Sequence, residues 1–354
     1  MNNIARIQQK LAEKELDAVL ITDEKNQRYA TGFPFTDGAV IVRRDRAFLI
    51  TDSRYIEAAE KAAGGCCEVQ MYDKENPRTQ RMKAALAGVE RLGAEESKLS
   101  FREYAELEEA LGLPLLPAQE IFSDLRAAKS EEELCCMRQA QAISEKALEE
   151  VLPLIRPGMT EREVAAELVY RMLRHGSEGN SFDPIVVTGK KTSMPHGVPG
   201  DEVIQPGDFV TMDFGCIKGG YCSDMTRTVA VGHATEEMRN VYAIVLEAQL
   251  AGIAAARAGI PGCEIDGAAR KVIADAGYGA YFGHGFGHSL GLDIHEAPGA
   301  NMSGKTPMPV GAVVSAEPGI YIPGKFGIRI EDVMILRENG AEVITKAPKE
   351  LLIL

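Results

Sequence analysis

The sequence lacks long hydrophobic runs and clusters of basic residues, and each absence excludes a class of protein. No apolar stretch reaches the roughly 18 residues that a transmembrane helix needs, and the segment Met1–Lys10 is polar, unlike a secretory signal. We therefore expect a cytoplasmic protein with no membrane partner. The 39 Lys and Arg residues against 52 Asp and Glu residues give a net charge of −13. Because no basic stripe could follow a phosphate backbone, no nucleic acid partner is expected.

The sequence also lacks a regular cysteine pattern and an HExxH motif. Its seven cysteines are an odd number, and the pairs Cys66-Cys67 and Cys135-Cys136 are adjacent. This pattern suits neither a disulfide framework nor a zinc knuckle, so reduced thiols are expected. The absence of HExxH excludes a single-zinc protease site on one helix.

The length of 354 residues and the hydrophobic content of 45% predict two domains, each with its own core. The first part of the chain alternates periodic helical segments with short apolar strands, which is typical of a small α/β domain. Asn26 and Tyr29, in NQRYATGF, are interpreted as turn and packing residues where a strand leaves the sheet. The predicted helices are Ile4–Lys14 and Tyr55–Ala63, and the predicted strands are Ala18–Ile21, Ala39–Val42 and Ala47–Ile50.

The character of the sequence changes near Arg126, where a charged amphipathic segment begins. Ser130 followed by Glu133, and Thr160 followed by Glu163, form two capping boxes that predict the starts of helices. We therefore predict an N-terminal domain of residues 1–125 and a second domain of residues 126–354, in which helices alternate with strands rich in Val and Ile. Further helices are predicted at about 160–173, 236–256 and 264–276.

Acidic residues occur within apolar strands of the second domain. The strand FVTMDF contains Asp213, and after the turn at Lys218-Gly219-Gly220 the returning strand contains Asp224. A hairpin centred between Lys218 and Gly219 places the two aspartates directly opposite, whereas one centred on Gly219-Gly220 makes them diagonal neighbours on the same face. In either register the two like charges must share a proton or hold a cation.

A second acidic pair repeats this arrangement near the C-terminus. Glu317 ends VVSAE, Glu331 lies in the strand GIRIEDVMIL, and a hairpin centred on Gly324 places them opposite each other. Arg329 shares a face with Glu331 and is its predicted orienting partner. Four carboxylates with one imidazole form an oxygen-rich set that suits two divalent metal ions, and we expect Mn²⁺, with Co²⁺ or Zn²⁺ as alternatives. The histidines of this half that the site could use are His196, His284, His288 and His295.

Five ordered motifs resemble those of a known family. MDFG, GYCSDMTRT, GHGFGHSLGLDIHE, SAEPGIY and GIRIED together resemble the signature set of the pita-bread metallopeptidases, and within it the Xaa-Pro aminopeptidases and prolidases. The resemblance implies an α/β (α+β) chain with a small creatinase-like N-terminal domain followed by a pita-bread catalytic domain, assembled as a homodimer. The implied activity is that of an Xaa-Pro aminopeptidase, which hydrolyses the bond before proline at the N-terminus of a peptide substrate.

The resemblance also implies which residues bind the metal ions. Asp213 would bind one ion, and His288 and Glu317 would bind the other. Asp224 and Glu331 would bridge the two. The ions would activate a water molecule for attack on the scissile carbonyl and polarise that carbonyl.

Four residues are implied to take part in catalysis. Glu317 is the implied carrier of the proton from the attacking water. His196 and His295 would hydrogen-bond the substrate and the reaction intermediate, and His284 would line the same pocket.

Alternative functions are weighed against the same motifs. Methionine aminopeptidases share the ligand set but generally lack this N-terminal domain and do not resemble GIRIED. Creatinase-type hydrolases keep the fold without the metals, whereas here every ligand position matches. A non-catalytic module of the same fold would have lost ligands or histidines. An Xaa-Pro dipeptidase stays open, because the sequence does not identify a cation that would recognise the free carboxylate after proline.

Overall fold

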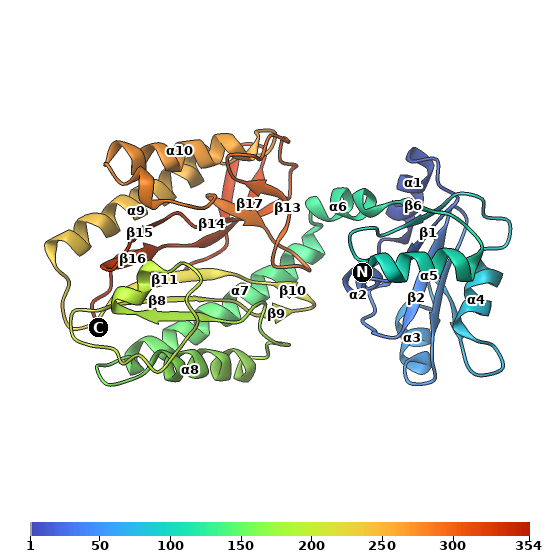
Figure 1. Ribbon diagram of the computed structural model, residues 1–354, viewed down its shortest axis with the longest axis horizontal. Helices are drawn as coiled ribbons and strands as arrows, with labels where there is room; N and C mark the ends of the chain where they lie inside the picture. The colour runs from blue at the N-terminus through green and yellow to red at the C-terminus, as the bar shows by residue number, and fades with distance from the viewer. Residues whose placement is uncertain (1) are drawn as a thin grey trace. The chain divides into compact units, whose positions relative to one another are not determined.

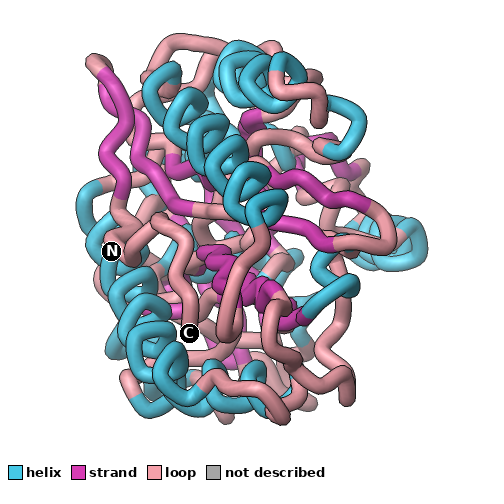
Figure 2. Tube along the Cα trace, turned by 90° about the vertical axis from the view of Figure 1, so that its left-hand side faces the viewer, coloured by secondary structure: helices cyan, strands magenta, loops and turns pink. Residues whose placement is uncertain are grey.

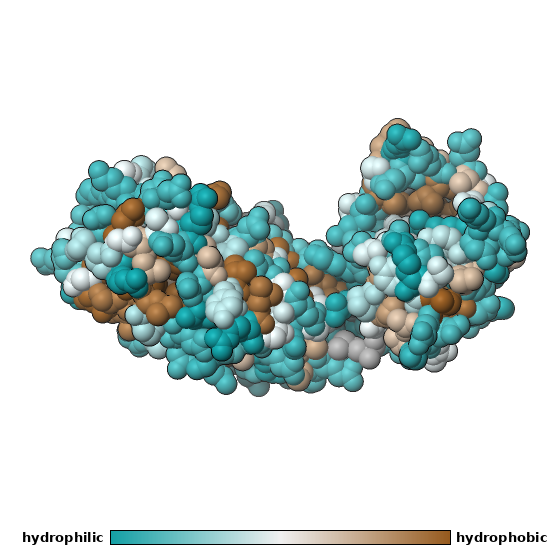
Figure 3. Space-filling model, turned by 90° about the horizontal axis from the view of Figure 1, so that it is seen from below, coloured by the Kyte–Doolittle hydropathy of each residue, from teal (hydrophilic) through white to brown (hydrophobic). Residues whose placement is uncertain are grey.

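The computed structural model describes residues 2–354, which form two units, the first ending at Arg126 and the second spanning Ala127–Leu354 (Figure 1). On the face drawn in Figure 3, hydrophilic residues predominate in both units and hydrophobic residues are exposed in separate patches, as is usual for a folded surface. None of the helices within residues 2–354 combines the length and the hydrophobicity needed to cross a membrane.

The first unit is built on a six-stranded mixed sheet. Its strands are β1 Ala18–Ile21, β2 Gly38–Arg43, β3 Ala47–Thr51, β4 Glu68–Met71, β5 Leu92–Ala94 and β6 Leu115–Pro117. The order across the sheet is β4-β3-β2-β1-β5-β6, antiparallel within β1 to β3 and parallel at both margins. All residues of β1 and β3 are buried, so these strands are continuous apolar runs rather than alternating patterns.

Helices connect the strands of this unit or flank them at its two ends. They are α1 Ile4–Glu13, α2 Glu24–Thr31, α3 Ile56–Ala63, α4 Arg78–Ala85, α5 Phe101–Leu111 and α6 Gln119–Ala127. The helices and strands predicted for this half of the chain are confirmed to within one residue at each end.

The prediction of a turn at Asn26 and Tyr29 is wrong, because both residues lie in helix α2. The helix begins after Asp23, whose side chain accepts a hydrogen bond from the Asn26 N–H, and it ends at Gly32 in the left-handed conformation. These two caps stabilise a helix of only eight residues that contains few apolar side chains. The packing role is confirmed, since both side chains are buried.

The second unit places strands between two pairs of helices (Figures 1 and 2). The helices are α7 Glu131–Val151, α8 Glu161–Arg174, α9 Glu236–Ala255 and α10 Gly262–Asp275, with short 3₁₀ helices at η1 Leu152–Leu154, η2 Gly189–Ser193 and η3 Gly279–Tyr281. The strands are β7 Ile185–Thr188, β8 Phe209–Phe214, β9 Ile217–Lys218, β10 Tyr221–Cys222, β11 Met225–Ala230, β12 Gly287–Ser289, β13 Glu296–Ala300, β14 Val313–Ala316, β15 Gly319–Ile322, β16 Phe326–Arg329, β17 Asp332–Arg337 and β18 Gly340–Val343.

Two hydrophobic cores join these layers. Helices α7 and α8 pack against the three-stranded sheet β11-β8-β7, and helices α9 and α10 pack against strands β14 to β17. Both predicted capping boxes are confirmed: Ser130 with Glu133 begins α7, and Thr160 with Glu163 begins α8. The packing of these four helices therefore holds in place the strands whose ends carry the acidic residues.

The first acidic hairpin adopts the diagonal register. Asp213 pairs with Thr226 rather than with Asp224, so the directly opposed register is wrong and the alternative centred on Gly219-Gly220 is confirmed. Both glycines have positive φ, 59° and 81°, as the favoured two-residue hairpin turn requires. The returning strand is interrupted between β10 and β11, and Asp224 lies in that interruption.

The second acidic hairpin has the predicted register. Gly319 pairs with Arg329 in the β15–β16 ladder, and Ala316 pairs with Asp332 in the β14–β17 ladder. Glu317 and Glu331 lie between these two ladders at the same register. The segment GIRIEDVMIL was predicted as one strand, but it divides into β16 and β17 at the position of Glu331.

Candidate active site

A cavity of about 590 Å³ lies in the second unit, within the size range of small-ligand sites. Every residue that the sequence singled out for metal binding or catalysis lines it. These residues are His196, Asp213, Asp224, His284, His288, His295, Glu317 and Glu331.

Strand ends and strand interruptions bring the four carboxylates to this cavity. Asp213 is the penultimate residue of β8, Asp224 lies between β10 and β11, Glu317 follows β14, and Glu331 lies between β16 and β17. At the interruptions the backbone leaves the regular ladder, so the acidic side chains can turn to a common point. Local sequence favours strands here, and the packed sheets decide where those strands break.

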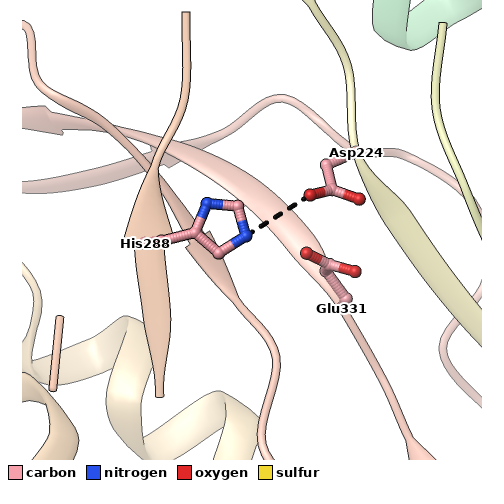
Figure 4. A group of neighbouring side chains, drawn as sticks. All are labelled: Asp224, His288 and Glu331. Atoms are coloured by element: carbon pink, nitrogen blue, oxygen red, sulfur yellow. Dashed lines mark ion pairs between the residues drawn. The ribbon is translucent and has the colours of Figure 1, made fainter. Parts of the chain in front are cut away.

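Three side chains form the centre of the site. Asp224, His288 and Glu331 point toward one another from separate segments, with one ligand atom of each within 4.8 Å of the others (Figure 4). The His288 Nε2 atom lies 3.5 Å from Asp224 Oδ2 and 3.3 Å from Glu317 Oε1. This spacing leaves room for a metal ion between the imidazole and the carboxylates.

The carboxylates are held close together out of water. Burial raises the pKa of Asp224 well above its usual range, and the charges of Glu331 and Asp213 raise it further. Burial and the charges of Glu317 and Asp213 likewise raise the pKa of Glu331. Such a cluster of like charges is unfavourable unless protons or cations compensate it.

Three oxygen atoms of the cluster have no hydrogen-bond partner among residues 2–354. They are Asp213 Oδ1, Asp224 Oδ1 and Glu331 Oε1, all buried. Buried polar atoms are almost always satisfied, and an unsatisfied carboxylate oxygen is especially costly. A divalent cation is the partner that this arrangement fits.

The ring of His288 leads to the same conclusion. Its Nδ1 lies 3.2 Å from the Ser289 carbonyl oxygen, which only accepts, so Nδ1 carries the ring proton. Burial lowers the pKa of His288 and favours the neutral ring. The Nε2 lone pair therefore faces the oxygens of Asp224 and Glu317, which is repulsive unless a cation lies between them. A backbone carbonyl that fixes the tautomer is a common support for a metal-binding histidine.

Arg329 orients a different carboxylate from the one predicted. Its Nη2 atom donates to Asp213 Oδ2 at 2.6 Å, and its Nε atom donates to Thr226 Oγ1 at 3.1 Å. Glu331 instead accepts from Thr226 Oγ1 at 2.7 Å. The predicted pairing of Arg329 with Glu331 is therefore wrong. Arg329 and Glu331 both line the cavity, but the guanidinium reaches across to Asp213 of β8 instead of to its neighbour on the same face.

Tyr321 links this arginine to His284. Its hydroxyl oxygen accepts from Arg329 Nη1 at 2.9 Å and lies 2.9 Å from His284 Nε2. Because the guanidinium only donates, the hydroxyl proton is directed to Nε2, and His284 Nδ1 donates to the Gly285 carbonyl at 2.8 Å. Burial raises the pKa of Tyr321 to about 12 and lowers the pKa of His284, so both are neutral near pH 7.

The remaining predicted histidines lie at the same cavity. The ring of His295 packs edge-to-face against that of His288, with centroids 4.2 Å apart. Burial, followed by the neighbouring His288, lowers the pKa of His295. His196 lines the cavity from the loop that follows η2. The structure thus brings together residues from segments that are far apart in the chain.

Two hydroxyl residues that support the site were missed from the sequence. Thr226 donates to Glu331, as described above. Ser315 Oγ donates to Glu317 Oε1 at 3.0 Å and accepts from the His288 N–H at 2.9 Å. Ser315 is the one polar residue of the apolar strand VVSA, which is the signal that could have identified it, whereas Thr226 lies in MTRTVA beside other polar residues and gives no such signal.

Comparison with known proteins identifies the family. The sequence model of metallopeptidase family M24 matches residues 135–338, more than half of the chain. The chain belongs to metallopeptidase family M24. A model of the creatinase/prolidase N-terminal domain matches residues 3–128. The predicted resemblance and the fold class are confirmed, and this M24 protein is a metal-dependent hydrolase.

Relatives of this M24 metallopeptidase include proteins of two activities. The chain is 41% identical over 340 residues to the uncharacterized peptidase YqhT of Bacillus subtilis, covering 96% of each chain. A structure of an Xaa-Pro dipeptidase from Bacillus anthracis is 42% identical, with a TM-score of 0.96 over 99% of each chain. An X-Pro aminopeptidase structure from Thermotoga maritima is 35% identical, with a TM-score of 0.91 over 96% of this chain and 98% of the other.

Proposed function

We propose that this M24 metallopeptidase is an Xaa-Pro aminopeptidase, which hydrolyses the bond on the amino side of proline at the N-terminus of peptides. The observation that carries the metal-dependent site is the set of buried, unpartnered oxygens of Asp213, Asp224 and Glu331 around the neutral ring of His288. Together with Glu317, these residues would hold two divalent ions. The oxygen-rich ligand set favours Mn²⁺, with Co²⁺ or Zn²⁺ as the alternatives.

The ions, when bound, supply a Lewis acid for the scissile carbonyl and lower the pKa of a water molecule. Glu317 would carry the proton of that water, and Ser315 orients the Glu317 carboxylate through a hydrogen bond of 3.0 Å. His196 and His295 would hydrogen-bond the substrate from the cavity wall. His284, fixed by Tyr321, would shape the same wall.

The preference for proline has a physical basis. The nitrogen of proline has no N–H, and the ring fixes the backbone, so a substrate cannot dock in the extended mode with a complete ladder of hydrogen bonds. A cavity with an apolar side can hold the ring instead. Phe182, Ile185 and Ile294 line the cavity beside the charged residues and supply that side.

The charge of the cavity supports an aminopeptidase. A dipeptidase needs a cation for the free carboxylate that follows proline. Among the described residues that line the cavity, Arg329 is the only Lys or Arg, and its guanidinium is paired with Asp213 at 2.6 Å. A longer peptide, which has no carboxylate at that position, needs no further cation.

An Xaa-Pro dipeptidase is the second candidate, because the relative from Bacillus anthracis bears that name. The two candidate functions are distinguished by measuring kcat/KM of the Mn²⁺-loaded protein on Ala-Pro and on Ala-Pro-Ala, with Ala-Ala-Ala as the control peptide. We expect preferred cleavage of Ala-Pro-Ala and little cleavage of Ala-Ala-Ala. Cleavage of Ala-Pro alone would favour the dipeptidase. Failure to cleave either proline peptide with both metals bound would contradict the proposed specificity.

We also propose that the protein is a homodimer, on the basis of its resemblance to this branch of the family. Light scattering at micromolar concentration measures this directly. A mass equal to the 38.3 kDa of one chain would contradict the dimer.

A further inference from the structure

The loop that carries His196 forms one rim of the cavity. It runs from Thr188, at the end of β7, through η2 to Gly200, and its residues 195–199 all line the cavity. Most of its tip is open to solvent: Met194 is 59% exposed and Val198 is 76% exposed, and of residues 194–198 only Gly197 is buried. The position of the tip must therefore depend on how the loop is held elsewhere.

One buried carboxylate binds both ends of this loop. Glu161, in the first turn of α8, has a side chain that is fully buried. Its Oε1 accepts from the Thr188 N–H at 2.8 Å, and its Oε2 accepts from the Gly200 N–H at 2.8 Å. The Lys191 Nζ atom donates to the same Oε2 at 2.6 Å and balances the charge. Charge-assisted bonds to a buried carboxylate are among the stronger hydrogen bonds in proteins.

The backbone at the start of α8 is itself fixed to the end of the loop and to the segment just beyond it. The Glu161 N–H donates to the Glu202 carbonyl at 3.1 Å, and the Arg162 N–H donates to the Gly200 carbonyl at 3.2 Å. Helix α8 is anchored in the core by Val164 and Leu168. Glu161 thus connects a rigid element to both ends of the loop.

The middle of the loop meets the residues that surround the carboxylate cluster. The Gly327 N–H donates to Thr192 Oγ1 at 2.8 Å, and Arg329 Nη1 lies 3.4 Å from the carbonyl oxygen of Pro195, the residue before His196. A shift of the loop ends would therefore move His196 relative to Asp213, the ion-pair partner of Arg329.

We propose that Glu161 is a positioning residue that closes the 188–200 loop and thereby places His196 against the substrate. This inference rests on the proposed function for the role of His196, but the hydrogen bonds by which Glu161 holds the loop are independent of that function. Misplacement of a catalytic group by about 1 Å can cost on the order of 10²-fold in rate. The loss expected from releasing the loop is therefore ~10- to 100-fold in kcat/KM.

The test is Glu161→Gln, which keeps the size of the side chain but removes one acceptor. Its single amide oxygen cannot serve both Thr188 and the Gly200–Lys191 pair, because the amide nitrogen would then face another donor. Glu202→Gln is the matched control, since Glu202 is an exposed second partner of Lys191 at 3.0 Å. Amide exchange by mass spectrometry, metal content and kcat/KM on Ala-Pro-Ala are measured for each variant.

For Glu161→Gln we expect faster amide exchange in residues 188–200, unchanged metal content and the stated loss of kcat/KM, and for Glu202→Gln none of these changes. In a His196→Ala background, Glu161→Gln should lower kcat/KM by less than about 3-fold, because both changes act through the same imidazole. Glu161→Asp, which keeps the charge, should restore part of the activity and serves if the Gln variant does not fold.

Two results would overturn the inference. Unchanged amide exchange of residues 188–200 in Glu161→Gln would show that Glu161 does not hold the loop, whether or not the protein hydrolyses Xaa-Pro peptides. Faster exchange in Glu161→Gln with full activity would show that Glu161 does not position His196. An equal loss of kcat/KM in the wild-type and His196→Ala backgrounds would show the same. If the wild-type protein cleaves no proline peptide, the proposed function fails, while the exchange measurement still decides whether Glu161 holds the loop.

Discussion

Arg329→Met tests whether the acidic cluster depends on a buried counter-charge when no metal is bound. Arg329 is 3% exposed and donates to Asp213 Oδ2, the Tyr321 hydroxyl and Thr226 Oγ1 at 2.6, 2.9 and 3.1 Å. Methionine has a similar length, so the loss of packing should be small. The main effect is to leave the Asp213 carboxylate buried without its partner.

The expected magnitude follows from that buried charge. Breaking a buried ion pair by removing one partner costs about 3–5 kcal/mol. The Asp213 charge already raises the pKa values of Asp224 and Glu331, after burial itself, so its repulsion with these carboxylates adds to the cost. Bound cations would compensate Asp213, and we therefore expect a smaller loss of unfolding free energy in Mn²⁺-loaded protein than in protein treated with a chelator.

The assay is urea unfolding with and without Mn²⁺, followed by circular dichroism because the chain contains no tryptophan. Amide exchange in β8 and β16 assigns the transition to the second unit. Lys325→Met is the matched control: its pair with Glu237 at 2.8 Å is exposed, and we expect no measurable change. A loss below about 1 kcal/mol in metal-free protein, or the same loss with and without metal, would refute the reasoning.

Four further outcomes are expected. Asp224→Asn should reduce bound metal, measured by elemental analysis, and lower hydrolysis by orders of magnitude, because a neutral amide cannot bridge two cations. His196→Ala should retain two metal ions while kcat/KM falls ~10²-fold; unchanged turnover would remove His196 from the site. Chelation should lower both Tm and activity, and Mn²⁺ or Co²⁺ should restore them; full activity after thorough metal removal would contradict the two-metal proposal. Burial raises the pKa of Glu95 in the first unit from 4.5 to about 7, so the folded state holds this proton more tightly. The stability that Glu95 itself contributes should therefore be complete below pH 4.5 and be lost as the pH rises through about 7, and Glu95→Gln should abolish this part of the pH dependence, as measured by amide exchange in β1 and β5.

The sequence alone determined the features that depend on neighbouring residues. Capping boxes at Ser130 and Thr160 predict helix starts because their hydrogen bonds form within one turn. The hairpin register around Gly324 follows from the turn itself, and it places Glu317 and Glu331 at the same level. The acidic residues in apolar strands predict a metal centre because such charges need compensation.

The tertiary structure decided which side chains meet. Arg329 pairs with Asp213 of β8 rather than with Glu331, because packing of distant sheets, and not strand alternation, sets that contact. Glu161 closes the His196 loop through partners at 188, 191 and 200, which no local pattern links to the start of α8. The breaks in the strands at Asp224 and Glu331 were likewise not predictable from the local sequence. Local propensity favours unbroken strands there, and only the assembled core bends the backbone so that the carboxylates converge.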